Sequence, residues 1–301
     1  EEFRGIIREL GDNVQPVVQE GERILFVVDR DDARIDVVVN IQYQGEASEF
    51  AWILPLSAPP SDVRVVPSRV FGTFDQLTAP VFRPTFERDG ACVGDRGADF
   101  GSDEALAASD GTNGNGGSPV QVLSRENVGP YETVVLDAPT GTEAAEWLTD
   151  NGYGVPPGSW PLLSSYIMRG DVLIALRLTN QVGVNDVQPI WITMPTAEPC
   201  VPLRLTQVAA LEDMGVTTLL LSDSRAIPEN FFHLEINQAR IDWVNFGQNY
   251  PDLVAEAANE ASGHAFLTEF AGPAAPVVDA TRPFFSSGLR GQLEQIEASA
   301  E

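Results

Sequence analysis

The sequence contains no lysine: all eighteen of its basic side chains are arginine, against 44 Asp and Glu residues. Without lysine the chain cannot form a Schiff base with pyridoxal phosphate or with a carbonyl substrate. A phosphate-binding loop ending in Gly-Lys-Ser/Thr, a kinase strand lysine and a Ser-x-x-Lys acylation site are excluded as well. The missing residue type removes several classes of enzyme before any motif is considered.

Positively charged side chains are scarce overall, and the formal net charge is therefore −26 over 301 residues. Such a surface repels nucleic-acid phosphates and anionic lipid headgroups, so we expect no nucleic-acid partner and no direct membrane insertion. No apolar run approaches the ~20 residues of a membrane span. A salty or calcium-rich medium favours an acidic, lysine-poor surface, whereas a GC-rich genome is a second explanation for arginine in place of lysine.

Cysteine is limited to Cys92 and Cys200. Two thiols are too few for a four-cysteine zinc site or an iron–sulfur cluster. In an oxidising compartment they can form one disulfide that closes a loop of over a hundred residues. Pairing of Cys92 with Cys200 and two free thiols stay open as alternatives.

Alternating apolar and polar side chains predict a sheet-rich fold. In residues 34–43, for example, Val37, Val39, Ile41 and Tyr43 alternate with Asp36, Val38, Asn40 and Gln42, which is the period of a strand with one face in a core. Strands are predicted at 23–29, 34–43, 49–55, 62–66, 120–126, 132–137, 171–179, 188–194, 201–209, 216–222, 230–236 and 264–270. Helices are predicted at 69–78, 142–151, 160–169 and 250–262.

The fold class that follows is α+β, with mostly antiparallel sheet in two β-rich lobes and a few packed helices. We place an N-terminal β-rich lobe at 14–87, a flexible acidic Gly/Asn-rich linker or loop at 88–118, a C-terminal α+β lobe at 119–272 and a polar tail at 273–301. The linker does not match a calcium-binding EF-hand loop, because Thr112 and Gly114 stand where ligands should follow Asp110. Two segments around Trp52 and Trp191 resemble each other, which makes an internal duplication one interpretation.

Only two histidines are present, His233 and His264. If their strands paired, His233, Glu235, His264 and Asp242 could form a two-histidine carboxylate site for a divalent metal. We favour the alternative that His264 caps the end of its strand after Gly263 and that His233 is a half-exposed strand residue, so no cofactor is predicted. No Gly-x-Ser-x-Gly nucleophile motif occurs, and no catalytic residue is predicted.

Several unusual segments occur together in one order. They are residues 15–24, 41–45, 50–55, 199–206, 226–230, 237–243 and 263–266. Together they resemble the bacterial family catalogued as domain of unknown function 2330, over roughly residues 14–272. The resemblance implies a secreted or envelope-exposed protein made with a leader, in many members with a membrane anchor outside this domain. It implies no activity, and the Cys-Gly-Gly-x-x-Cys stretch typical of members has no counterpart in residues 3–12.

The function that we expect is therefore that of a non-catalytic extracytoplasmic protein, secreted or in the cell envelope, with a binding or structural role. Its partner would be a protein or a surface. The alternative is a metal-binding protein or metal-dependent enzyme that uses His233 and His264 with nearby carboxylates.

Overall fold

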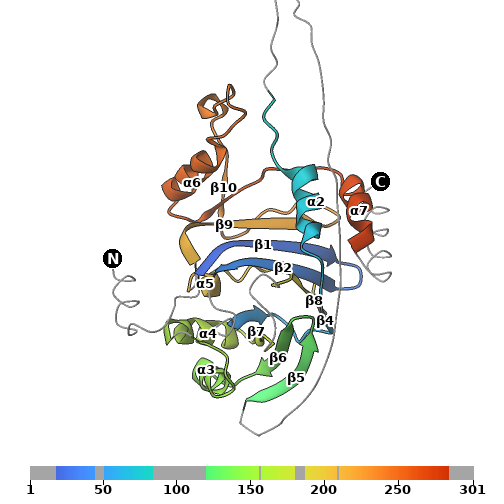
Figure 1. Ribbon diagram of the computed structural model, residues 1–301, viewed down its shortest axis with the longest axis vertical. Helices are drawn as coiled ribbons and strands as arrows, with labels where there is room; N and C mark the ends of the chain where they lie inside the picture. The colour runs from blue at the N-terminus through green and yellow to red at the C-terminus, as the bar shows by residue number, and fades with distance from the viewer. Residues whose placement is uncertain are drawn as a thin grey trace, which may run out of the picture. The chain divides into compact units, whose positions relative to one another are not determined.

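The computed structural model describes residues 18–44, 51–83, 120–155, 157–179, 187–208 and 210–284 (Figure 1). These residues belong to two compact units, which we call the large unit and the small unit. The large unit is drawn from Glu1–Gly72, Asp110–Ser224 and Ala274–Glu301, and the small unit from Thr73–Ser109 and Arg225–Pro273.

Strands and helices are both well represented among the described residues. The strands are β1 (Val18–Asp29), β2 (Arg34–Gln44), β3 (Ala51–Leu56), β4 (Asp62–Val65), β5 (Gln121–Val128), β6 (Tyr131–Asp137), β7 (Val172–Leu178), β8 (Ile190–Met194), β9 (Ala210–Leu221), β10 (Phe232–Leu234) and β11 (Ala265–Leu267). The α-helices are α2 (Arg69–Thr78), α3 (Gly141–Asp150), α4 (Trp160–Ile167), α5 (Leu203–Thr206), α6 (Tyr250–Glu260) and α7 (Ala275–Thr281). Short 3-10 helices are η2 (Pro157–Ser159), η4 (Gln238–Arg240) and η5 (Arg282–Phe284).

The large unit contains two sheets. One has five strands in the order β4-β8-β2-β1-β9, and the other has four in the order β3-β7-β6-β5. Their neighbouring strands run antiparallel except for β1 and β9, which are parallel. The small unit has one parallel pair, β10 and β11. The predicted α+β class with mostly antiparallel sheet is therefore confirmed.

The predicted division into lobes differs from the observed units. Both sheets combine strands from the two predicted lobes. In the five-stranded sheet, β8 of the predicted C-terminal lobe (119–272) lies between β4 and β2 of the predicted N-terminal lobe (14–87). In the four-stranded sheet, β3 of the N-terminal lobe pairs with β7 of the C-terminal lobe. Local patterning located most of the strands but carries no information about which distant strand becomes a neighbour. The range 88–118, predicted as a linker, lies outside the described residues.

The hairpin of β1 and β2 shows how the apolar runs become sheet. Leu25 lies opposite Val38 and Phe26 opposite Val37, so both faces of this central pair are apolar. The turn between them is closed by a hydrogen bond from the Asp32 amide to Asp29 Oδ1, at 3.1 Å. A central strand pair buried on both faces requires a cover on each side.

The four-stranded sheet covers one face of the five-stranded sheet, and the residues between the two sheets form the main core. Because successive side chains on a strand point to opposite faces, every second residue contributes to this core. Its buried members are Ile24, Phe26, Val28, Ile35, Val37, Val39, Ile41, Trp52, Leu54, Leu56, Tyr131, Val135, Val172, Ile174, Leu176, Leu178, Ile190, Ile192 and Met194.

A second core lies on the far face of the four-stranded sheet, where α3 and α4 pack (Figure 1, green). Thr140 begins α3 with the predicted capping box: its Oγ1 accepts a hydrogen bond from the Glu143 amide at 3.2 Å and donates to Glu143 Oε2 at 2.9 Å. Gly141 lets the start of α3 approach the backbone of Ser164 on α4, since a Cβ at that position would lie 2.4 Å from the Ser164 nitrogen.

Two predicted segments have a different structure. Residues 201–209 were expected to form a strand, but Leu203–Thr206 is the short helix α5, which begins directly after Pro202. The predicted polar tail 273–301 contains α7, in which Val277 and Val278 are buried. The guanidinium of Arg69, at the start of α2, lies 5.3 Å from the ring centre of Phe284, just after α7.

The two Trp-containing segments have related positions in the sheets. The first segment contributes β2 to the five-stranded sheet and β3 to the four-stranded sheet. The second contributes β8 to the five-stranded sheet and β7 to the four-stranded sheet. In each sheet the two segments pair with each other, β2 with β8 and β3 with β7. This reciprocal pairing is what a duplicated unit would give, although the third element is a strand in one segment and the helix α5 in the other. In the part of the chain described here, no helix has the length and apolar character needed to cross a membrane.

Candidate functional site

The two histidines lie in the small unit, on neighbouring segments. Strands β10 and β11 pair as the metal hypothesis required, with His233 opposite Phe266. His264 stacks on Phe231 at 5.7 Å between ring centres, and its Nδ1 lies 2.9 Å from the Ser262 carbonyl oxygen. Both histidines are thus exposed at or beside this strand pair, and the His264 ring stacks on an aromatic ring.

The carboxylates of the predicted metal site do not complete a ligand set. Asp242 accepts hydrogen bonds from the Asn245 amide at 3.2 Å and from Asn245 Nδ2 at 2.7 Å, and these bonds lower the pKa of Asp242. Glu235 follows β10 and is exposed. Over the described residues, no group of three or more His, Cys, Asp or Glu is placed to hold a metal ion. The metal site stays a prediction.

Of the two cysteines, one belongs to the described part of the chain. Cys200 is an exposed free thiol, and Cys92 lies outside the described residues. The disulfide between them likewise stays a prediction.

A buried polar cluster stands out in the five-stranded sheet. The carboxylate of Asp36 is 1% exposed and accepts hydrogen bonds from Trp191 Nε1 at 3.0 Å, from Arg34 Nη2 at 3.1 Å and from Thr193 Oγ1. The guanidinium of Arg64 lies 4.4 Å from the Trp191 ring centre. Since these groups satisfy one another within the sheet, we assign the cluster to the fold rather than to ligand binding.

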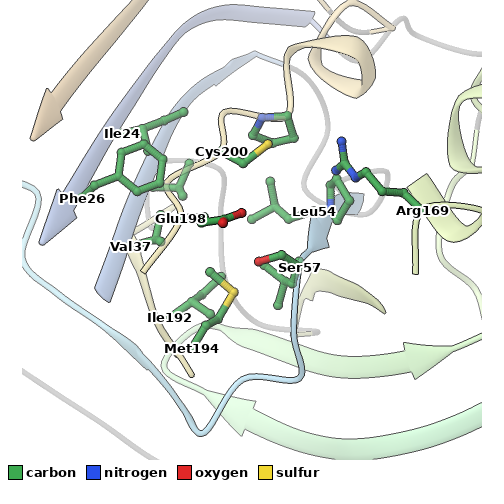
Figure 2. A pocket seen from close by; sticks show the side chains of 14 residues that line it. Ile24, Phe26, Val37, Leu54, Ser57, Arg169, Ile192, Met194, Glu198 and Cys200 are labelled. Atoms are coloured by element: carbon green, nitrogen blue, oxygen red, sulfur yellow. The ribbon is translucent and has the colours of Figure 1, made fainter. Parts of the chain in front are cut away.

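A pocket opens into the core between the two sheets of the large unit (Figure 2). Its volume is about 40 Å³. The floor consists of buried apolar side chains from β1, β2, β3 and β8: Ile24, Phe26, Val37, Val39, Leu54, Leu56, Ile192 and Met194. The mouth consists of four polar side chains: Ser57, Arg169, Glu198 and Cys200.

One side of the mouth is fixed by a salt bridge. Arg169 Nε lies 3.1 Å from Asp171 Oδ2, and its Nη2 donates to the same oxygen; these bonds raise the pKa of Arg169. The guanidinium lies 5.0 Å from the ring centre of Tyr166. Burial raises the pKa of Tyr166, and the neighbouring Cys200 acts in the same direction. Arg169 is thus held in place with Nη1 not used in a hydrogen bond to any described residue.

The other side of the mouth carries polar groups without partners. Figure 2 shows Glu198 and Arg169 on opposite sides of Leu54, with the Glu198 carboxylate directed over the floor and the Ser57 hydroxyl below it. Neither the Glu198 carboxylate nor Ser57 Oγ bonds to another group in the described part of the chain. The arrangement offers one acceptor, one hydroxyl and one cation around an apolar opening.

A second candidate is the surface of the small unit. Among the described residues, eight of the eleven exposed large apolar side chains belong to it: Leu77, Val81, Ile227, Phe232, Trp243, Val244, Phe246 and Phe270. Monomeric proteins expose single apolar residues routinely, but a concentration of them in one small unit is typical of an interaction surface.

The turn 242–247 carries three of these side chains, Trp243, Val244 and Phe246. It is closed by hydrogen bonds from the Gly247 amide to the Asp242 carbonyl at 2.8 Å and from Asn245 to the Asp242 side chain. Val244 is 76% exposed and Phe246 is 65% exposed. Phe246 has a φ of 54°, a left-handed conformation that costs a phenylalanine free energy.

The side chain of Phe82 packs against the same turn. Its ring lies 5.8 Å from the Trp243 ring and 4.9 Å from the Tyr250 ring. It also lies so close to Gly247 that a Cβ there would approach a ring carbon to 2.3 Å. The turn is therefore a rigid support for two exposed apolar side chains, and nothing in the sequence pattern separated Val244 and Phe246 from core residues.

Comparison with known proteins gives one match. The chain matches the family model described as "Uncharacterized protein conserved in bacteria (DUF2330)" over residues 12–293. No curated protein and no solved structure matches. The match covers both units, including the segments that carried the resemblance, and the chain belongs to this bacterial DUF2330 family.

Proposed function

We propose that this protein is a non-catalytic extracytoplasmic protein that binds another protein through the apolar surface of its small unit. The observation that carries the proposal is that eight exposed large apolar side chains of the described residues belong to this unit, three of them in the closed turn 242–247. Aromatic side chains supply most of the binding energy at the centres of protein interfaces. A turn that is rigid before binding loses little conformational entropy when the partner arrives.

The charges of this unit indicate what kind of protein surface would bind to it. Residues 225–273 carry seven acidic side chains and two arginines, and Arg240 is paired with Glu256 at 2.6 Å. A complementary surface is therefore apolar at its centre and basic at its rim. A second copy of this chain, with its own charge of −26, is a poor fit.

The extracytoplasmic location rests on the family resemblance and on the acidic, lysine-free surface. It can be tested with Cys200, which is an exposed thiol. In a Cys92→Ser background, a membrane-impermeant maleimide should label Cys200 of the full-length protein in intact cells. Labelling only after cell lysis would contradict the location.

The binding surface can be tested by placing a photo-crosslinking amino acid at position 244 of the full-length protein in its host. Position 168 is the matched control, because Met168 is 82% exposed but belongs to the large unit. We expect position 244, and not 168, to crosslink one protein. Crosslinks to lipid alone, or equal products at both positions, would contradict a protein partner.

Phe246→Asn then separates binding from folding. Asparagine tolerates the left-handed backbone at this position, so the variant should be at least as stable as the parent. It should nevertheless bind the purified crosslinked partner at least about tenfold more weakly, as expected for the loss of an aromatic contact at an interface centre. Met168→Ser should bind normally; unchanged affinity of Phe246→Asn would remove the turn from the interface.

A further inference from the structure

We propose that the pocket between the two sheets of the large unit binds a small aliphatic group that carries an α-ammonium: a valine-like residue, free or at the N-terminus of a peptide. This site is separate from the apolar surface of the small unit, so the two proposals stand or fall independently.

The floor sets the size and polarity of the part that enters. All eight floor side chains are buried and apolar. A cavity of ~150 Å³ holds benzene, so a volume of about 40 Å³ accommodates about two carbon atoms. The two methyl groups of a valine side chain fit this volume, whereas an aromatic ring does not.

The mouth sets the chemistry of the part that stays outside. Glu198 and Ser57 offer oxygen atoms without partners among the described residues, which suits the three N–H donors of an ammonium group. On the opposite side, Arg169 has Nη1 free of bonds to described residues, which suits a carbonyl or carboxylate oxygen. An α-ammonium and a carboxyl carbon are separated by one carbon atom, and the side chain leaves from that same atom toward the floor.

Net charge favours the cationic half of this ligand. Arg169 is neutralised by Asp171, so Glu198 remains the uncompensated charge at the mouth. The field of a chain with a net charge of −26 raises the local concentration of cations and lowers that of anions. A fatty acid, which would match the floor equally well, carries the wrong charge.

Methionine methyl groups give a direct test, because the chain contains only three methionines. Met194 lines the pocket, whereas Met168 and Met214 do not. With ¹³C-methyl methionine in the whole chain, valine or the peptide Val-Gly-Gly at up to about 10 mM should shift the Met194 signal and leave Met214 unchanged. N-acetylvaline, which lacks the ammonium, should shift none of them.

Three variants decide the outcome. Ser57→Tyr places a ring over the mouth and should abolish the shift, and Glu198→Gln should weaken binding at least about tenfold through loss of the charged acceptor. Glu146→Gln, an exposed change on α3, should bind as the parent does. A response to valine alone identifies a free amino acid, and a response to Val-Gly-Gly alone identifies peptide N-termini. No Met194 shift with either ligand, or equal shifts in all three variants, overturns the proposal.

Discussion

Arginine is the only cationic side chain of this protein, and in the structure its planar guanidinium repeatedly lies over an aromatic ring. Arg64 stacks on Trp191 at 4.4 Å, Arg177 on Tyr153 at 5.2 Å and Arg169 on Tyr166 at 5.0 Å. Arg177 at the same time donates to Glu132 Oε2 at 2.7 Å. A lysine ammonium is compact and strongly hydrated, so it cannot combine a flat stack with a forked ion pair. Arginine is thus suited to the contacts that these positions make.

Two buried tyrosines test the value of a hydrogen bond at the residue scale. The Tyr131 hydroxyl donates to the Gln188 carbonyl at 2.6 Å and accepts from the Gln188 amide at 2.8 Å. The buried Tyr153 hydroxyl has no hydrogen-bond partner among the residues that the structure describes. Tyr131→Phe should therefore lower the free energy of unfolding by about 1–3 kcal/mol, whereas Tyr153→Phe should change it by less than about 0.5 kcal/mol or raise it. Urea unfolding of both variants at neutral pH provides the comparison; equal losses would contradict it.

The buried hydroxyl of Tyr153 should also make the free energy of unfolding depend on alkaline pH. Burial raises the pKa of Tyr153 from 10.0 to about 12. Because the unfolded chain loses this proton first, the stability linked to Tyr153 is complete below about pH 10 and falls as the pH rises toward 12. Tyr153→Phe should therefore lose less stability over this interval than the parent in urea unfolding.

At the scale of elements, two helix glycines have opposite roles. A Cβ on Gly141 would lie 2.4 Å from the Ser164 nitrogen, whereas a Cβ on Gly72, in α2, would meet nothing within 4 Å. Gly141→Ala should push α3 away from α4 and cost about 3 kcal/mol or more. Gly72→Ala should instead raise the free energy of unfolding by about 0.5–1 kcal/mol, because alanine has the higher helix propensity. Chemical unfolding of both variants would show the opposite signs; a loss of stability in both would contradict the prediction.

Sequence patterns predicted elements better than their partners. The helix 69–78 was predicted to the residue, because Val70, Phe71 and Phe74 mark one apolar face. Residues 201–209 were wrongly predicted as a strand, since four alternating residues fit a turn of helix after Pro202 equally well. The buried Val277 and Val278 of α7 were missed within a Pro- and Ala-rich segment.

The candidate sites were less predictable still. The predicted site was based on the two histidines, because histidine is rare in this sequence. The pocket mouth is instead formed by Ser57, Arg169 and Glu198, which come from segments far apart in the chain. Nothing local distinguishes Glu198 from the other acidic residues of this sequence. Such a site depends on strand neighbours, and strand neighbours are set by long-range packing that no short window contains.

For the whole molecule, charge repulsion should limit stability. A net charge of −26 is carried with few ion pairs between the described residues, and several of these are exposed. Exposed pairs contribute little, whereas like charges across the surface repel one another at low ionic strength. The Tm should therefore rise between about 10 and 300 mM NaCl, as the screening length falls below the spacing of surface charges. A Tm that falls with salt would mean that attractive pairs outweigh the repulsion.

The parallel pairing of β1 with β9 also sets a timetable for the newly made chain. β1 ends at Asp29, and its neighbour β9, the edge strand of the five-stranded sheet, ends at Leu221, so the pairing of β1 on that side cannot be completed until some 190 further residues have been synthesised. At typical translation rates this delay is on the order of ten seconds or more. Until then the β1 edge of the hairpin lacks its partner strand, and an unpaired apolar edge is the kind of surface to which other chains or chaperones bind. We therefore expect the five-stranded sheet to be completed only after β9 has been synthesised.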